Sequence, residues 1–285
     1  MTPTEKRQRF RAILNGPRCV SPATVFDALS ARVAESVGYE VGILSGSVCA
    51  ATMLAAPDLA LHSLTEFSDQ LRRITRASNL SVFVDADNGY GNALNVMRTV
   101  EELEHAGVSG VAIEDVIMPA RFGSESATEL VSVDEMAGKL RAAVAARRDP
   151  ALLVVARSAS LKSEKTASAV ARAKAYAATG VDALFIVGMK KLEDLDAIRA
   201  EVRLPIIMGT MPGVKREELS ARGVRFCLQG HPAVAASVKA LRDTYAHLYA
   251  GGAPEDLKSK IATPEEMSRL LGEDNYRKWR ANYLH

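Results

Sequence analysis

The sequence predicts an α/β protein, a (β/α)8 barrel of the TIM type followed by C-terminal helices. Short apolar runs recur along the chain with amphipathic segments between them, and there are eight such runs. Eight β/α units in about 250 residues match the size of a TIM barrel. The runs are continuously apolar, which is typical of strands buried on both faces of a parallel sheet. An open doubly wound sheet is the alternative, but it has no reason to stop at eight strands.

The eight runs predict the strands in chain order. They are residues 18–20, 41–45, 81–85, 110–114, 152–157, 183–187, 205–209 and 224–229. The segments EHAGVSGVAIE and YAATGVDALFIV resemble each other, because each reads as a helix end, a glycine and a strand. This repeated unit is local support for a β/α build.

Amphipathic patterns predict the helices between the strands. Residues 92–106 end at Gly107 and place four apolar side chains on one stripe, Leu94, Met97, Val100 and Leu103. Residues 165–179 also end at a glycine, Gly180. Ser132, with Glu135 three residues later, predicts a capping box at another helix start. Residues 253–285 look helical and lie beyond the eighth unit, as a tail of one domain that spans residues 1–285.

Composition and charge exclude several classes of protein. Of the 285 residues, 48% are hydrophobic and 25% charged, and the net charge of +2 gives no reason to expect nucleic acid or a membrane as partner. The three cysteines lie far apart, which argues against disulfides and a zinc site. The charged N-terminus lacks a signal-peptide core, and the longest apolar stretch, near residues 47–57, is too short to span a bilayer. We therefore expect a cytoplasmic protein.

Polar residues stand where several predicted strands end. Because active sites of TIM barrels form at the carboxyl ends of the strands, these residues are the candidates for chemistry. They are Ser45, Gly46 and Ser47 after the second strand, Asp85 and Asp87 at the third, Glu114 and Asp115 at the fourth, Arg157 at the fifth, and Gly230 and His231 after the eighth.

The acids at the third and fourth strands predict a metal site. Asp85 and Asp87 are two residues apart, so on an extended backbone their side chains face the same way, and Glu114 can join them from the adjacent strand. Two or three hard oxygen ligands in a partly hydrated site suit Mg²⁺. The alternative is that these acids cap helices or pair with Lys and Arg. Three acids on neighbouring strand ends favour the metal.

The other candidates each have a structural alternative. Gly46 and Ser47 offer backbone N–H groups for an oxyanion, although Ser-Gly-Ser is also common in turns. Arg157 closes a buried strand and needs an anion, either an Asp or Glu partner or a substrate carboxylate. His231 either begins a helix or contacts the substrate, and the other polar residues at this edge favour the contact. Gly89 and Gly91 fit a sharp turn into a helix better than a phosphate loop.

The segment VDADNGYGNALNVMRTVEELEHAGVSGVAIED resembles the signature of the isocitrate lyase/phosphoenolpyruvate mutase superfamily. The resemblance continues from VFDALSARVAESVGYEVGILSGSV through AAPDLAL to VVARS. It implies a (β/α)8 barrel whose last helix is usually exchanged between subunits, in a homotetramer built as a dimer of dimers. It also implies a Mg²⁺ enzyme that acts on 2-oxo acids, or on hydroxy acids that release them, through an enolate-like intermediate.

The same resemblance assigns roles to residues. It implies that Asp85 holds Mg²⁺ (or Mn²⁺) directly and that Asp58, Asp87 and Glu114 support it, largely through water. It implies that the substrate is bound by the residues Ser45, Gly46, Ser47, Arg157 and His231, of which Ser47, Arg157 and His231 are the candidate catalytic residues.

Departures from the superfamily pattern narrow the expected reaction. Lyase members carry a loop like KKCGH with a catalytic Cys, whereas residues 119–123 read PARFG, so isocitrate cleavage is not expected. The stretches VFDALSAR, LSGSVCAA, IMPARFG and GH look most like the oxaloacetate decarboxylase branch, although residues 206–213 lack an aromatic residue expected there. We therefore expect Mg²⁺-dependent decarboxylation of oxaloacetate, or of a close 3-carboxy-2-oxo acid. The alternatives are P–C bond chemistry on phosphonopyruvate, or a barrel that binds a metal and a dicarboxylate without turnover.

Overall fold

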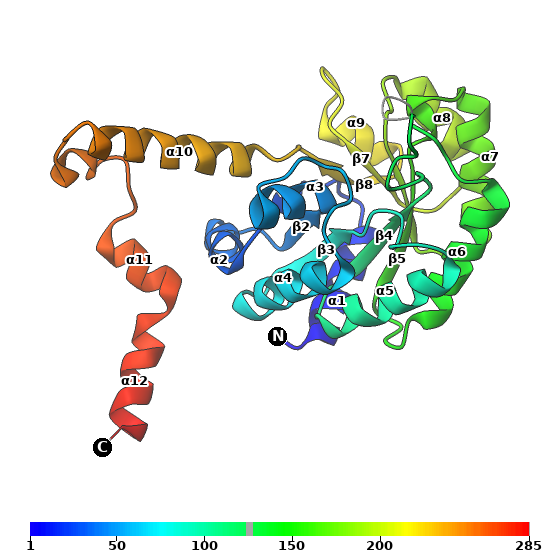
Figure 1. Ribbon diagram of the computed structural model, residues 1–285. Helices are drawn as coiled ribbons and strands as arrows, with labels where there is room; N and C mark the ends of the chain where they lie inside the picture. The colour runs from blue at the N-terminus through cyan, green and yellow to red at the C-terminus, as the bar shows by residue number, and fades with distance from the viewer. Residues whose placement is uncertain (124–127, 285) are drawn as a thin grey trace.

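The computed structural model describes residues 1–123 and 128–284 and contains one eight-stranded parallel sheet (Figure 1). Each strand pairs with the next in chain order. The strands are β1 Ala23–Thr24, β2 Val41–Ser45, β3 Ser81–Asp85, β4 Gly110–Glu114, β5 Leu153–Ser158, β6 Ala183–Ile186, β7 Ile206–Gly209 and β8 Val224–Leu228. A parallel bridge between Val20 and Phe226 joins the last strand to the segment before the first, which closes the sheet into a barrel.

The prediction for the first strand was wrong in position. Residues 18–20 contribute only the bridge, in which Val20 donates its N–H to the Arg225 carbonyl and accepts from the Cys227 N–H, both at 2.9 Å. Pro22 has no N–H to donate, and β1 begins after it. The other seven predicted strands agree with the structure within one residue at each end.

Helices alternate with the strands; most of them cover the outside of the barrel, whereas the first closes one end and the last ones extend away from it (Figure 1). They are α1 Pro3–Asn15, α2 Ala28–Val37, α3 Gly46–Cys49 continued by a π-helical turn Ala50–Leu54, α4 Leu64–Ala77, α5 Ala93–His105, α6 Val133–Ala146, a 3-10 turn Ser160–Lys162, α7 Thr166–Ala177, α8 Leu192–Glu201, α9 Arg216–Ala221, α10 Pro232–Tyr249, a 3-10 turn Pro254–Leu257, α11 Pro264–Leu271 and α12 Glu273–Tyr283.

Two details of the predicted helices need correction. Leu94 is 74% exposed, because α5 begins at Ala93 and turns Val96, Val100 and Leu103 toward the barrel instead. Among the described residues, the cap at Ser132 works in one direction only: its hydroxyl accepts the Glu135 N–H at 3.1 Å, but the Glu135 side chain does not return a bond.

The interior of the barrel is filled by aromatic and branched side chains, and α1 closes its amino-terminal end. Phe10 of α1 stacks on Phe83 and Phe226, with ring centroids 5.9 and 5.0 Å apart. Gly110 lies directly under this ring, since a Cβ there would be 2.7 Å from Phe10 Cε1. This packing blocks one end of the barrel and leaves the carboxyl ends of the strands for a site.

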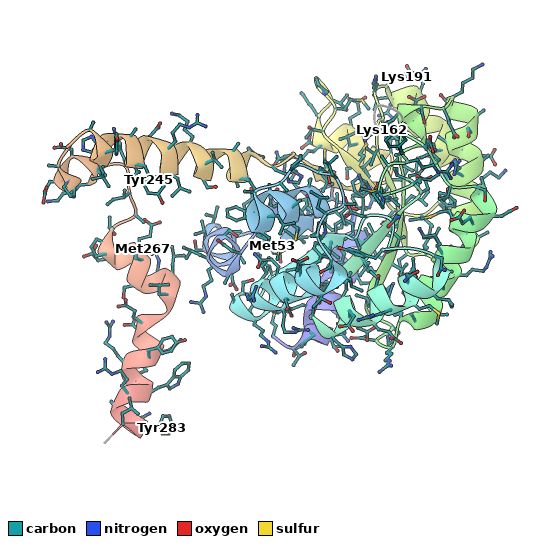
Figure 2. The ribbon with its side chains drawn as sticks, in the orientation of Figure 1. Met53, Lys162, Lys191, Tyr245, Met267 and Tyr283 are labelled. Carbon is teal, nitrogen blue, oxygen red and sulfur yellow. The ribbon has the colours of Figure 1, made fainter. Side chains whose placement is uncertain are left out.

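The last helices extend away from the barrel (Figure 1). No residue of α10 is buried, and Tyr245 on α10 and Tyr283 on α12 lie well clear of the sheet (Figure 2). The chain turns back through α11, where Arg32 of α2 donates to the Leu270 carbonyl at 2.8 Å. Within the described part of the chain, no helix combines the length and hydropathy needed to cross a bilayer.

Candidate active site

A cavity of 370 Å³ opens at the carboxyl ends of the strands. It brings together residues that are far apart in the sequence. Among the predicted site residues, its walls include Ser45, Ser47, Asp58, Asp85, Asp87, Glu114, Arg157 and His231. Gly46 lies immediately behind the wall, against Asp87.

The backbone after β3 presents two carboxylates to the cavity. Asp85 is the last residue of β3 and pairs in register with Ser45 of β2. Asp87 follows in a left-handed conformation (φ 49°), and its carbonyl accepts the Glu114 N–H at 2.8 Å. Its carboxylate rests on Gly46, where an added Cβ would lie 2.4 Å from Asp87 Oδ1. Glycine is therefore required at position 46 because of this close approach.

Arg157 sits between two of the acids. Its Nη1 lies 2.6 Å from Asp85 Oδ2 and 2.7 Å from Glu114 Oε2, and its guanidinium stands 5.3 Å from the centre of the Phe185 ring. Although burial lowers it, the pKa of Arg157 is raised overall by the charges of Asp85 and Glu114. Two kinds of anion were expected beside Arg157, an Asp or Glu side chain or a substrate carboxylate. In this structure its partners are the side chains of Asp85 and Glu114.

The acids destabilise one another's charge. Burial, and then repulsion from Asp85, Glu114 and Asp58, raises the pKa of Asp87 to about 8. Burial also raises the pKa of Glu114, to about 7, although Arg157 opposes the shift. One Arg therefore does not offset the repulsion that opposes ionisation of these acids, and a divalent cation is the kind of ligand that would stabilise their charged forms.

The side-chain oxygens that could bind a metal ion are only partly gathered around one point. Among the described residues, Asp85 Oδ1 is buried and has no hydrogen-bond partner. In the same part of the chain, no three side chains of His, Cys, Asp or Glu lie close enough together to enclose a metal. Asp58 lies at an exposed position on the loop after the π-helical turn. Such an arrangement suits a cation that keeps several of its waters.

The loop after β2 carries the candidate anion cradle. Ser45 caps α3, and its hydroxyl accepts the Val48 N–H at 3.3 Å. Gly46 and Ser47 are the first residues of that helical turn, where backbone N–H groups have no partner within the helix. The Ser45 and Ser47 hydroxyls are 2.9 Å apart. This turn therefore aims small polar donors at the cavity beside Asp85.

His231 is held by two hydroxyl groups at the end of β8. Thr24 Oγ1 lies 3.1 Å from its Nδ1, and Ser45 Oγ lies 3.2 Å from its Nε2. Burial lowers the pKa of His231, although Asp85 and Asp58 oppose the shift. The ring is therefore neutral at neutral pH and belongs to a chain of hydrogen bonds that runs from Thr24 to Ser47.

The structure adds residues to the site that the sequence reasoning missed. Thr210 follows β7 and lines the cavity, so the rule applied to the other strand ends would have found it. Thr24 orients His231 from β1, whose position had been predicted wrongly. Met118 and Met189 form apolar parts of the wall from loops, and no sequence signal indicated them.

Comparison with known proteins shows which family and which relatives this chain resembles in sequence. Residues 10–249 match the family model described as phosphoenolpyruvate phosphomutase. The chain is 45% identical over 274 residues to an oxaloacetate decarboxylase of Bradyrhizobium diazoefficiens, covering 94% of this chain and 93% of that protein. It is 46% identical over 268 residues to an oxaloacetate decarboxylase of Rhodopseudomonas palustris, covering 93% and 92%.

Solved structures with this fold are more distant in sequence. A phosphoenolpyruvate phosphomutase from Streptomyces platensis subsp. rosaceus superimposes with a TM-score of 0.89 at 28% identity, covering 98% of this chain and 99% of that one. A phosphonopyruvate hydrolase in complex with oxalate and Mg²⁺ gives a TM-score of 0.88 at 29% identity, with full coverage of both chains. Proteins with this architecture thus include one that binds Mg²⁺ with a small dicarboxylate.

Proposed function

This chain belongs to the phosphoenolpyruvate mutase/isocitrate lyase superfamily, and we propose that it decarboxylates oxaloacetate to pyruvate and CO2. The observation that carries the proposal is the composition of the 370 Å³ cavity, in which an acid cluster, Arg157 and His231 face one another. The 45% identity to an oxaloacetate decarboxylase over 94% of the chain supports the same reaction. The substrate is a small 2-oxo dicarboxylic acid.

The residues present fit Mg²⁺ as the cofactor. The buried Asp85 Oδ1 has no hydrogen-bond partner among the described residues, and burial and the neighbouring acids raise the pKa of Asp87, so a cation would stabilise the charged form of the cluster. We expect Asp85 to hold the cation, with Asp58, Asp87 and Glu114 binding its waters. When bound, a divalent cation neutralises the negative charge that develops on the substrate's C2 oxygen as CO2 leaves. Mn²⁺, with similar ligand preferences, should substitute for it.

The chain's own side chains bind and orient the substrate. The N–H groups of Gly46 and Ser47, at the start of α3, would donate to the C1 carboxylate and the C2 oxygen, and the Ser47 hydroxyl adds a donor. Arg157 supplies a positive charge beside the anionic substrate. Preorganised donors of this kind act where charge develops and need no reorganisation during the reaction.

His231 has the role of holding the departing carboxylate. Its ring is neutral because burial lowers its pKa, so it carries one N–H, and the C4 carboxylate would have to replace Ser45 as the partner of Nε2. Thr24 and Ser45 fix the plane of the ring at the cavity wall. This favours a hydrogen bond to the C4 carboxylate over proton delivery by His231, so that the proton that C3 takes up after CO2 has left would come from water.

A homotetramer built through the last helices is the proposed assembly. A groove of 940 Å³ lies between α2 and α10, and its walls are largely apolar. Leu241 and Tyr245 of α10 are 52% and 65% exposed, and Val37 of α2 is 71% exposed. We propose that subunits exchange α10 so that a neighbouring copy covers these side chains.

A coupled assay tests the reaction directly. Purified protein is mixed with oxaloacetate and Mg²⁺, and pyruvate is followed with lactate dehydrogenase. Because free Mg²⁺ also decarboxylates oxaloacetate, the assay includes a protein-free blank and an Asp85→Ala variant. We expect turnover well above the blank for the wild type, and loss of most activity with Asp85→Ala.

Two results would contradict this proposal. A fully active Asp85→Ala protein would remove the metal assignment. If the wild type shows no turnover above the blank, phosphonopyruvate is the next substrate, since a phosphonopyruvate hydrolase shares the fold at 29% identity. Phosphate release from phosphonopyruvate would then identify P–C bond hydrolysis.

A further inference from the structure

A buried histidine stands behind the acid cluster, outside the cavity wall. His62 lies just before α4 and is 4% exposed. Its ring packs against Phe67 and Tyr90, with centroids 5.4 and 5.9 Å away. Tyr90 belongs to the turn after β3 that also carries Asp87. His62 is therefore fixed by aromatic contacts from α4 on one side and from the Asp87 turn on the other.

The polar atoms of His62 are unused in this packing. Among the described residues, both of its ring nitrogens are buried without a hydrogen-bond partner. A buried polar group left unpaired is destabilising, so in a native protein it calls for an explanation. The Asp87 carboxylate provides one, because Asp87 Oδ2 lies 3.8 Å from His62 Nε2.

Among the described residues, the Asp87 carboxylate has no hydrogen-bond donor on the side that faces His62. Gly46 lies so close to Asp87 Oδ1 that a Cβ added at position 46 would collide with this oxygen. Within residues 1–123 and 128–284, no group donates a hydrogen bond to the Asp87 carboxylate. A movement of about 0.6–1 Å would bring His62 Nε2 within hydrogen-bond distance of Oδ2.

We propose that His62 is a positioning residue for the cation site: its Nε2–H donates to Asp87 Oδ2 and holds that carboxylate toward the bound cation. This inference rests on the cation site proposed above. Groups that hydrogen-bond to metal-binding side chains orient them, and their loss typically weakens metal affinity by about 10- to 100-fold. His62 does not contact the substrate in this role, so its loss should affect cation binding first.

Three substitutions of His62 distinguish a hydrogen bond to Asp87 from a role in packing alone. In His62→Gln, the amide nitrogen stands near the former Nε2 and can still donate to Asp87. In His62→Asn, the shorter amide stands near Nδ1 and does not reach. His62→Phe keeps a ring in the aromatic cluster but removes both nitrogens. Tyr90→Phe is the matched control, since it removes another buried, unpartnered polar atom from the same cluster.

The readout is the dissociation constant for Mn²⁺, measured from the electron paramagnetic resonance signal of the free ion without substrate. We expect His62→Asn and His62→Phe to raise it about 10-fold, while His62→Gln and Tyr90→Phe keep the wild-type value. Wild-type affinity in His62→Phe, or equal losses in the Gln and Asn variants, would overturn the proposal. Thermal unfolding without the cation identifies any variant that fails to fold.

The Asp85→Ala protein separates this inference from the proposed function. If Asp85→Ala binds Mn²⁺ like the wild type, the cation site itself is misassigned. If Asp85→Ala loses Mn²⁺ but His62→Phe does not, the cation site stands and only the role of His62 falls.

Discussion

At the scale of single residues, the site is defined by how charge is balanced in a small cavity. Arg157 makes ion pairs of 2.6 and 2.7 Å with Asp85 and Glu114, yet the pKa of Asp87 is still raised to about 8. One guanidinium therefore does not balance the four acids around the cavity. The proposed cation would relieve this imbalance by stabilising the ionised acids.

His231 provides a residue-scale prediction about catalysis. His231→Ala should lower kcat by about 10²–10³, the usual cost of one lost stabilising contact, because it removes the proposed donor to the C4 carboxylate. Thr24→Val should have a smaller effect, since the ring remains and only the hydroxyl that contacts its Nδ1 and the Gly230 carbonyl is lost. Steady-state kinetics with oxaloacetate, together with the melting temperature of each variant, provide the check.

The ring is only half-buried, so His231→Ala should fold normally. If His231→Ala had the wild-type kcat and KM, His231 would be a structural residue that merely begins α10. Equal losses for Thr24→Val and His231→Ala would mean that orientation of the ring, rather than its presence, limits the reaction.

At the scale of elements, most β/α units place a polar residue at the same edge of the barrel, whereas the end of β6 contributes the apolar Ile186 and Val187. Register matters here: Ser45 pairs with Asp85 between β2 and β3, and Glu114 pairs with Arg157 between β4 and β5. A shift of one residue would turn these side chains to the other face of the sheet. At the opposite end, Phe10 of α1 packs against Phe83 of β3 and Phe226 of β8.

Gly110 tests the contribution of that closed end. Gly110→Ala should reduce the free energy of unfolding by about 1–3 kcal/mol, because its Cβ would be 2.7 Å from the Phe10 ring. Gly138→Ala is the control: in α6 an added Cβ meets nothing nearer than Arg141 at 4.0 Å. The control should be neutral, or more stable by about 0.5–1 kcal/mol.

Denaturant unfolding of both variants, followed by circular dichroism, measures these changes. Equal stability of Gly110→Ala and the wild type would show that α1 can move away from β4 without cost.

At the scale of the whole molecule, the barrel and its last helices differ in how they are stabilised. The eight strands and their covering helices share a continuous core, whereas α10 has no buried residue (Figure 1). An 18-residue helix with exposed Val238, Leu241 and Tyr245 needs an apolar partner surface, because isolated helices of this length are only marginally stable in water. The proposed exchange of α10 provides that surface.

Leu241→Glu tests the assembly. We expect light scattering to give the mass of a tetramer for the wild type and a smaller species for Leu241→Glu, because a charge would be buried without a partner in the interface. Leu94→Glu is the matched control, since Leu94 is 74% exposed on α5, away from the groove. A monomeric wild type, or the same mass for wild type and Leu241→Glu, would contradict exchange through α10.

The sequence by itself determined the fold class and most of the strands. Seven of the eight strands were located within one residue, because strands buried on both faces read as continuous apolar runs. The first strand was misplaced because it is only two residues long, follows Pro22 and carries almost no such signal. Leu94 was misjudged because a periodic pattern does not by itself show which face of the helix meets the barrel.

For the candidate site, too, one part could be predicted from the sequence and another part depended on the tertiary structure. The polar strand ends were visible in the sequence because the carboxyl ends of all strands in a parallel barrel meet at one edge. Only the tertiary structure decided that Arg157 lies between Asp85 and Glu114, that Asp87 rests on Gly46, and that His62 stands behind it. These contacts join segments far apart in the chain, and their geometry depends on packing that no local pattern encodes.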